Sequence, residues 1–110
     1  MNPVWVPVVR ARTPWARFKG LLGDRALPSG CGLLFERCRA VHTLGMRRAI
    51  DVVFLGPEGR VLEMHRGLGA GRVAYCRKAR GVLELAAGDA WRLGLWTGCQ
   101  VLLIDREAQR

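Results

Sequence analysis

A histidine and a carboxylate lie nine residues apart in VHTLGMRRAIDVVFL, residues 41–55 of the chain. Histidine in general can act as an acid or a base at physiological pH, and a carboxylate can fix its tautomer, so this pair could perform acid–base catalysis if successive strands bring the two together. No serine or cysteine nucleophile is positioned beside them. The structural alternative is favoured: His42 lines a wall, and Asp51 bonds the backbone of the 45–48 turn or pairs with Arg47 or Arg48.

Other side chains near this segment could bind a ligand. Met46 could line an apolar pocket with tryptophan rings, although Trp15 and Trp91 fall on helix faces that are expected to pack on a sheet. Glu84 lies between leucines in VLEL and faces either solvent or a polar interior, where Arg17 could pair with it. The contact surface expected from the sequence comprises His42, Thr43, Met46, Asp51 and Glu84.

The four cysteines match no standard metal or redox motif, because the sequence contains no C-x-x-C. Cys31, Cys38 and His42 offer soft ligands, but their spacing fits no structural zinc site, so neither a metal nor a cofactor is predicted. Cys38 lies between two arginines that could lower a thiol pKa. Those neighbours point to the other strand face, so a buried, unreactive thiol is favoured. Reduced thiols are expected, as in a cytoplasmic protein.

The net charge of +9 is almost entirely arginine, since Lys19 and Lys78 are the two lysines. Such a charge attracts anionic partners. The arginines, however, are spread from Arg10 to Arg110 without a block of five like charges, and a composition bias of the genome would give the same total. Nucleic acid is therefore not the expected partner. No window reaches the ~18 apolar residues of a membrane span, and the first residues do not resemble an export signal, so a cytoplasmic location without membrane insertion is expected.

The pattern of apolar residues and turns predicts one domain, residues 1–110, built mostly of short strands. Two prolines in the first strand predict that it lies at the edge of a sheet. IDVVFL is apolar on both faces, so this strand is expected to be central or within a closed wall. The expected fold is α+β: a compact, mostly-β domain with a partly closed β-barrel of six to seven short strands, capped by two short helices. Strands are predicted over 3–9, 32–37, 40–43, 50–55, 60–66, 73–76, 82–85 and 100–104, and helices over 13–22 and 88–95.

Three segments resemble, in order, the motifs of the family called domain of unknown function 192. They are RFKGLLGDRALPSGCGLLF, VHTLGMRRAIDVVFLGPEGRVLEM and VLELAAGDAWRLGLWTGCQV, which together cover about residues 17–104. The resemblance implies a single small domain of strands and short helices, and no activity, cofactor or substrate. The chain departs from the family pattern at Leu22, where methionine is usual, at His42, where many members have an aromatic residue, and at Cys99, where aspartate is usual.

Three functions are compatible with the sequence. The favoured one is a small, cytoplasmic, non-enzymatic binding or accessory module that contacts a protein or a small ligand near His42 and Asp51. The first alternative is a small hydrolase- or isomerase-type enzyme that uses these two residues. The second is a weak nucleic-acid binder that acts through its arginines, although no recognised nucleic-acid motif is present.

Overall fold

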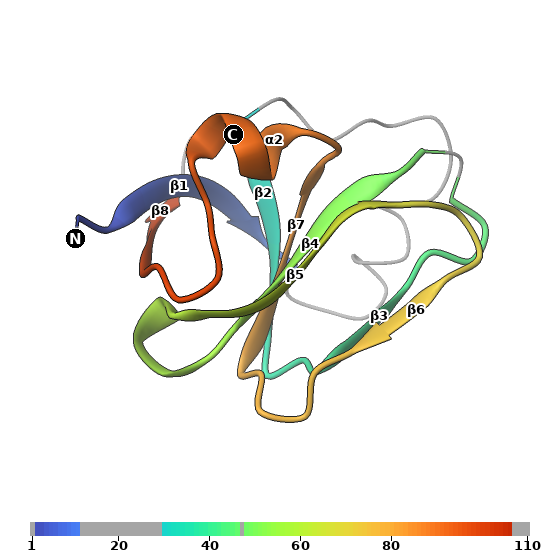
Figure 1. Ribbon diagram of the computed structural model, residues 1–110, viewed down its shortest axis with the longest axis horizontal. Coiled ribbons are helices and arrows are strands. Elements are labelled where there is room, and N and C mark those ends of the chain that lie inside the picture. Colours follow the sequence, from blue (N-terminus) through green and yellow to red (C-terminus); the bar gives the residue numbers. More distant parts are fainter. Residues whose placement is uncertain (1, 12–29, 47, 107–110) are drawn as a thin grey trace.

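A six-stranded sheet forms the centre of the molecule, and a separate two-stranded sheet lies beside it (Figure 1). The computed structural model describes residues 2–11, 30–46 and 48–106. The strands are β1 (Val4–Arg10), β2 (Gly32–Glu36), β3 (Ala40–His42), β4 (Ile50–Leu55), β5 (Val61–Leu68), β6 (Val73–Tyr75), β7 (Gly81–Ala86) and β8 (Val101–Asp105). The helices are the 3-10 turn η1 (Pro57–Gly59) and the short α2 (Asp89–Leu93).

The large sheet has the order β5-β4-β7-β2-β1-β8 and is not closed into a barrel. Its two outer strands approach each other only where they begin, through an isolated bridge between Arg60 and Gln100 and a 2.8 Å hydrogen bond from the N–H of Val61 to the carbonyl of Cys99. The mostly-β domain is confirmed, whereas the partly closed barrel is not. Each of the eight predicted strand ranges contains a strand, which is more than the six to seven strands expected for the barrel, and the short β3 and β6 pair with each other outside the large sheet.

Strand β1 is not at the edge of the sheet, contrary to the sequence-based expectation. It pairs in parallel with both β2 and β8. The pairing with β2 begins at Val8, immediately after Pro7, while the N–H of Val4 bonds the carbonyl of Gln100 towards β8. Because alternate residues of a strand face opposite neighbours, Pro7 presents its missing N–H towards β2, before the pairing with β2 starts. The proline is tolerated in an interior strand for this reason.

Arg10 joins the three parallel strands at their carboxyl ends. Its guanidinium contacts Glu36 at the end of β2 at 3.0 Å and Asp105 at the end of β8 at 3.2 Å. Burial alone would lower the pKa of Arg10, but the hydrogen bonds and charges of the two carboxylates raise it overall. The contacts are exposed, so they contribute little stability and mainly fix the side chains at this corner of the sheet.

The hairpin of β4 and β5 forms as the sequence predicts, with η1 as its turn. All six residues of β4 are buried, and the strand lies between β5 and β7. Successive side chains point to opposite faces of a sheet. Val53 and Leu55 therefore enter a core with β1, β8 and α2, whereas Val52 and Phe54 enter a second core on the other face.

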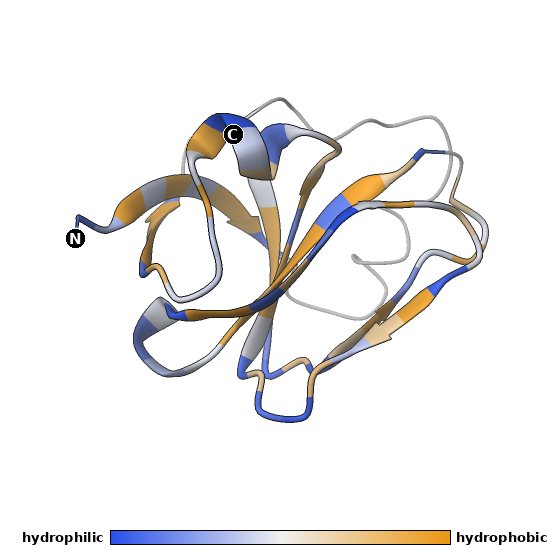
Figure 2. Ribbon diagram, viewed as in Figure 1, coloured by the Kyte–Doolittle hydropathy of each residue, from blue (hydrophilic) through white to orange (hydrophobic). Residues whose placement is uncertain are grey.

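Strands β3 and β6 form an antiparallel ribbon that covers the second core. Val41 and Ala74 are 2% and 5% exposed and pack against the face of the large sheet that contains Phe54. Figure 1 shows this ribbon on one side of the central strands β4 and β7, and α2 with the sheet strands β1 and β8 on the other. The central strands are coloured mainly apolar, whereas the loop from β6 to β7 is hydrophilic (Figure 2).

The helix expected over 88–95 is confirmed as α2, although it is shorter. Gly88 precedes it and Gly94 follows it, both in the left-handed region, with φ of 93° and 78°. Glycine adopts this conformation without the steric cost that other residues incur, so the two glycines delimit the helix. The other expected helix, over 13–22, lies outside the described residues together with Arg17, so a cap of two helices is not confirmed. Among the described helices none has the length and apolarity required to cross a membrane.

Candidate functional site

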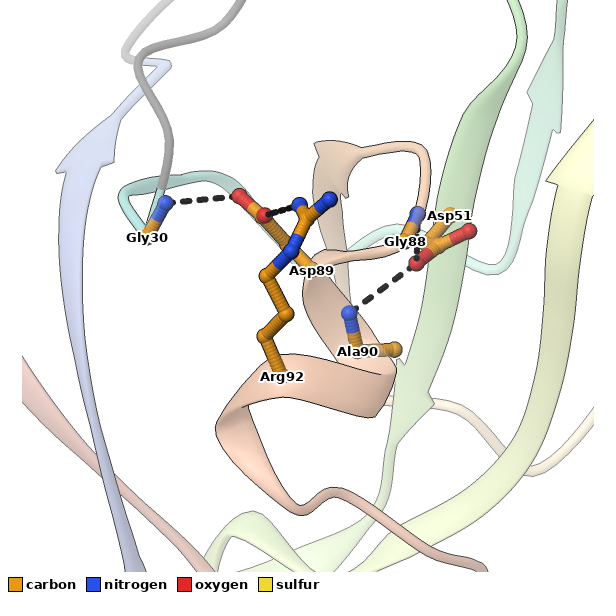
Figure 3. Close-up of polar contacts among 6 residues, drawn as sticks. All are labelled: Gly30, Asp51, Gly88, Asp89, Ala90 and Arg92. Carbon is orange, nitrogen blue, oxygen red and sulfur yellow. Dashed lines mark hydrogen bonds and ion pairs between the residues drawn. The ribbon is translucent and has the colours of Figure 1, made fainter.

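The carboxylate of Asp51 is a buried hydrogen-bond acceptor that joins three segments of the chain. It is 1% exposed and lies on β4, on the face that packs against α2. Its Oδ1 accepts the N–H of Gly67 at 2.8 Å, and its Oδ2 accepts those of Gly88 and Ala90, both at 3.0 Å (Figure 3). Asp51 thus bonds backbone, as the structural interpretation expected, but its partners lie in β5 and at the start of α2 instead of in the 45–48 turn.

A second buried aspartate lies in the first turn of α2. Asp89 is 1% exposed; its Oδ2 accepts the N–H of Gly30 at 2.6 Å and its Oδ1 contacts the guanidinium of Arg92 at 2.8 Å. Figure 3 shows both aspartates at the beginning of the helix, where the free N–H groups and the helix dipole favour negative charge. The two carboxylates are therefore satisfied within the protein and hold α2 on the sheet. Asp89 was not among the candidate residues predicted from the sequence.

Thr43 and Met46 stabilise the end of the ribbon from inside. Thr43 is fully buried; its hydroxyl donates to the carbonyl of Gly69 at 2.6 Å and accepts the N–H of Arg72 at 2.8 Å. Met46 is 7% exposed and belongs to the core beneath the ribbon. A binding role for either residue stays a prediction, and the contacts that they make are with the protein itself.

Glu84 lies on the face opposite to Asp51. It is 1% exposed and pairs across β7 and β4 with Val52, whose side chain points into the core beneath the ribbon. Asp51 points into the core that contains α2. The large sheet therefore separates these two acids, and the structure does not bring them to a common cavity. Arg17, the partner suggested for Glu84, lies outside the described residues.

His42 is the exposed member of the predicted set. It lies on β3 opposite Val73 of β6, and both side chains point away from the core that Val41 fills. Asp51 is buried on the far face of the large sheet, where three backbone N–H groups occupy its oxygens. The proposed pair is therefore not assembled. Acid–base chemistry by His42 and Asp51 has no geometric support here.

Three more exposed side chains accompany His42 on the outer side of the ribbon. Val73 is 70% exposed and Tyr75 57%, both on β6, and Leu44 just after β3 is 56% exposed. On the other side of the molecule Trp91 is 75% exposed, although the sequence placed it against the sheet. The short α2 instead buries Ala90 and turns Trp91 towards solvent.

Most of the net charge lies in the two segments that build the ribbon. Residues 37–48 and 69–80 are called the basic ribbon below. They contain eight Arg and Lys residues and no Asp or Glu, whereas the other 86 residues contain ten Arg and Lys residues and nine Asp and Glu residues. Backbone bonds bring the segments together: the N–H of Arg37 bonds the carbonyl of Arg80, and that of Cys76 bonds the carbonyl of Arg39, both at 2.8 Å. The arginines are spread along the chain, but pairing of the two segments brings many of them together in space.

The described cations of the basic ribbon are all exposed, and none forms an ion pair with a described acid. They are Arg37, Arg39, Arg48, Arg72, Arg77, Lys78 and Arg80. Sequence inspection missed this cluster because no segment carries a long run of like charge. The signal that could have found it is the absence of acids from two segments that pair with each other.

The cysteines offer no metal site in the part of the chain that the structure describes. No group of three or more potential ligands gathers among these residues, and all four cysteines are free thiols. Cys99 is 3% exposed and its Sγ accepts the N–H of Trp96 at 3.5 Å. Burial raises the pKa of the Cys31 thiol, although the charge of Arg106 acts in the opposite direction. Cys99 is therefore a buried core thiol, whereas Cys31 is half-buried.

The chain belongs to the DUF192 family, described as an uncharacterised ACR, and matches it over residues 2–103. The match is broader than the segments 17–104 that the motifs suggested. The family has no assigned activity, so membership explains the fold and leaves the function open. No curated protein matches the sequence.

Two solved structures share the fold. A protein of unknown function from Novosphingobium aromaticivorans has a TM-score of 0.68 and 23% identity, over 83% of this chain and 69% of that one. A protein from Sinorhizobium meliloti, described as a "putative transcription regulator", has a TM-score of 0.66 and 25% identity, over 89% of this chain and 79% of that one.

Proposed function

We propose that the protein is a small, non-enzymatic binding module that recognises an anionic partner through the basic ribbon. The observation that carries this proposal is the concentration of positive charge on two adjacent segments that contain no acid, where the described cations form no ion pair with a described acid. Such a patch attracts polyanions and steers their association, whereas a balanced surface does not. His42 retains its predicted place on the contact surface, because its side chain is exposed between the two ends of the ribbon.

The buried polar residues support a binding role over an enzymatic one. The polar atoms of Asp51 and Thr43 form hydrogen bonds with backbone groups, and no described acid lies beside His42 to orient its ring. We include a cytoplasmic location in the proposal, supported by the four free cysteines, since such thiols persist in reducing compartments. The regulatory description of the Sinorhizobium protein also fits a module that binds a partner.

Retention on a heparin column tests the proposal with two variants that lose the same charge. Arg77→Gln/Lys78→Gln removes two cations from the basic ribbon, and Arg60→Gln/Arg106→Gln removes two exposed cations outside it. The wild-type protein should be retained, and the ribbon variant should elute at clearly lower salt than the control variant. No retention of the wild-type protein, or equal shifts of both variants, would refute the proposal.

A further inference from the structure

The outer face of the basic ribbon combines exposed rings with the cations. Tyr75 lies opposite Ala40, and His42 lies opposite Val73, so the two rings are diagonal neighbours on one face. Diagonal neighbours in antiparallel strands are roughly 7–8 Å apart, close enough to form one continuous surface. Ala40, opposite Tyr75, has a side chain that is too small to cover the Tyr75 ring. Two planar groups are therefore presented to solvent side by side.

Cations lie at both ends of this ring pair. At one end Arg37 and Arg80 are adjacent through their backbones, and Arg77 and Lys78 continue from β6 into the loop. At the other end Arg72 is held beside Thr43 by backbone and side-chain bonds. Arginine binds phosphate oxygens in a bidentate manner, so each end can hold a phosphate group while the rings between them remain free.

We propose that this face binds single-stranded nucleic acid: unpaired bases stack on Tyr75 and His42, and the flanking cations contact phosphates. The inference rests on the proposed function and specifies its partner. Rings on a strand surrounded by basic residues form the stacking platform that single strands require. A duplex hides the faces of its bases, and an acidic protein contacts the cations but has no bases to stack on the two rings. These features favour a single strand over both.

Fluorescence anisotropy with two labelled twelve-residue strands separates stacking from charge. One strand is oligothymidylate, and the other is an abasic phosphodiester of the same length. The wild-type protein should bind the first at least about fivefold more tightly, because each stacked base strengthens binding by about that factor or more. With about four phosphates contacted, the logarithm of Kd should rise with the logarithm of the salt concentration with a slope of about 3.

Two matched variants assign the stacking to the ribbon. Tyr75→Leu retains an apolar side chain but removes the ring, and it should abolish most of the preference for oligothymidylate while leaving abasic binding unchanged. Trp91→Leu removes an even more exposed ring from α2, on the other side of the large sheet, and should change neither the preference for oligothymidylate nor the abasic binding. Circular dichroism confirms that both variants are folded.

The contrary outcomes are distinct. Equal affinity for the two strands, or tighter binding of a duplex, overturns the single-strand inference. If the protein is still retained on heparin, the proposed function as a module that binds an anionic partner stands. Ribbon-dependent binding to phosphatidylserine vesicles without binding to oligothymidylate overturns it in favour of a membrane surface. If the wild-type protein binds neither heparin nor any strand, the proposed function fails as well.

Discussion

Asp51 on β4 and Ala90 on α2 are joined by a 3.0 Å hydrogen bond between a buried carboxylate and a backbone N–H. The same carboxylate accepts the N–H groups of Gly88 and Gly67, so one side chain joins the central strand, the start of the helix and the edge strand β5. Asp51, the acid that the sequence made the main candidate, therefore has a structural role. The basic ribbon, on which the proposed binding function rests, lies on the opposite side of the molecule.

The first prediction concerns this carboxylate. Asp51→Asn should lower the free energy of unfolding by about 2–4 kcal/mol, because an amide presents one oxygen and two N–H groups where three N–H donors need acceptors. Urea denaturation followed by tryptophan fluorescence measures the loss. Asp105→Asn is the control, since its contact with Arg10 is exposed and should cost less than about 1 kcal/mol. A variant at position 51 as stable as the control would contradict the structural role.

The Thr43 hydroxyl should matter more than its methyl group. Thr43→Val removes the bonds to Gly69 and Arg72 but keeps the shape, and we expect a loss of about 1–3 kcal/mol because buried partners are left unsatisfied. Thr43→Ser keeps the hydroxyl and loses one methyl group, which costs about 1 kcal/mol. Thermal unfolding of the two variants should show valine as the more damaging change. The reverse order would mean that packing, and not these bonds, fixes the end of the ribbon.

Gly59 should tolerate no side chain. Its φ is +75°, and a Cβ would lie 2.3 Å from the carbonyl oxygen of Val101, where the two outer strands of the sheet meet. Gly71 has a similar φ of +72° but open space around it. Gly71→Ala therefore measures the conformational cost alone, about 1–2 kcal/mol, and Gly59→Ala should exceed it clearly in urea denaturation. Equal losses would show that β8 moves aside without cost.

The cysteines should differ in their reactivity towards iodoacetamide. Cys99 is 3% exposed and should be modified only after unfolding. Since burial raises the pKa of Cys31, a smaller fraction of its thiol is ionised at neutral pH, and its labelling should keep increasing with pH beyond the range of an ordinary thiol. Mass spectrometry of labelled peptides measures both rates. Rapid labelling of Cys99 in the native protein would contradict its burial.

Local patterns predicted the elements better than their neighbours in the sheet. The apolar run of β4 and its turn predicted the hairpin, because periodicity and turn residues are local signals. The predicted position of β1 at the edge of the sheet was wrong. A proline shows that one backbone N–H is missing, but it does not show which neighbouring strand that position of the backbone faces. The partners of Asp51 were also not predictable, because Gly67 and Gly88 approach it only through tertiary packing.

The contact surface illustrates the same limit. The residue types in the 41–55 segment drew attention to His42 and Asp51, but alternation along the strands turned one to solvent and the other into a core. The cations that flank β3 lie far along the chain from those that flank β6, and the two groups become neighbours only when these strands pair. The order of charges along the chain therefore did not predict the cluster of cations on the basic ribbon, which forms only when the chain folds.

The most direct test of the central claim is an NMR titration of the 15N-labelled protein with a heparin dodecasaccharide at low salt. The account predicts that the amide signals that shift first belong to residues 37–48 and 69–80, the basic ribbon, while those of α2 and β8 stay in place. Shifts centred on α2 or β8, with the ribbon unaffected, would contradict it.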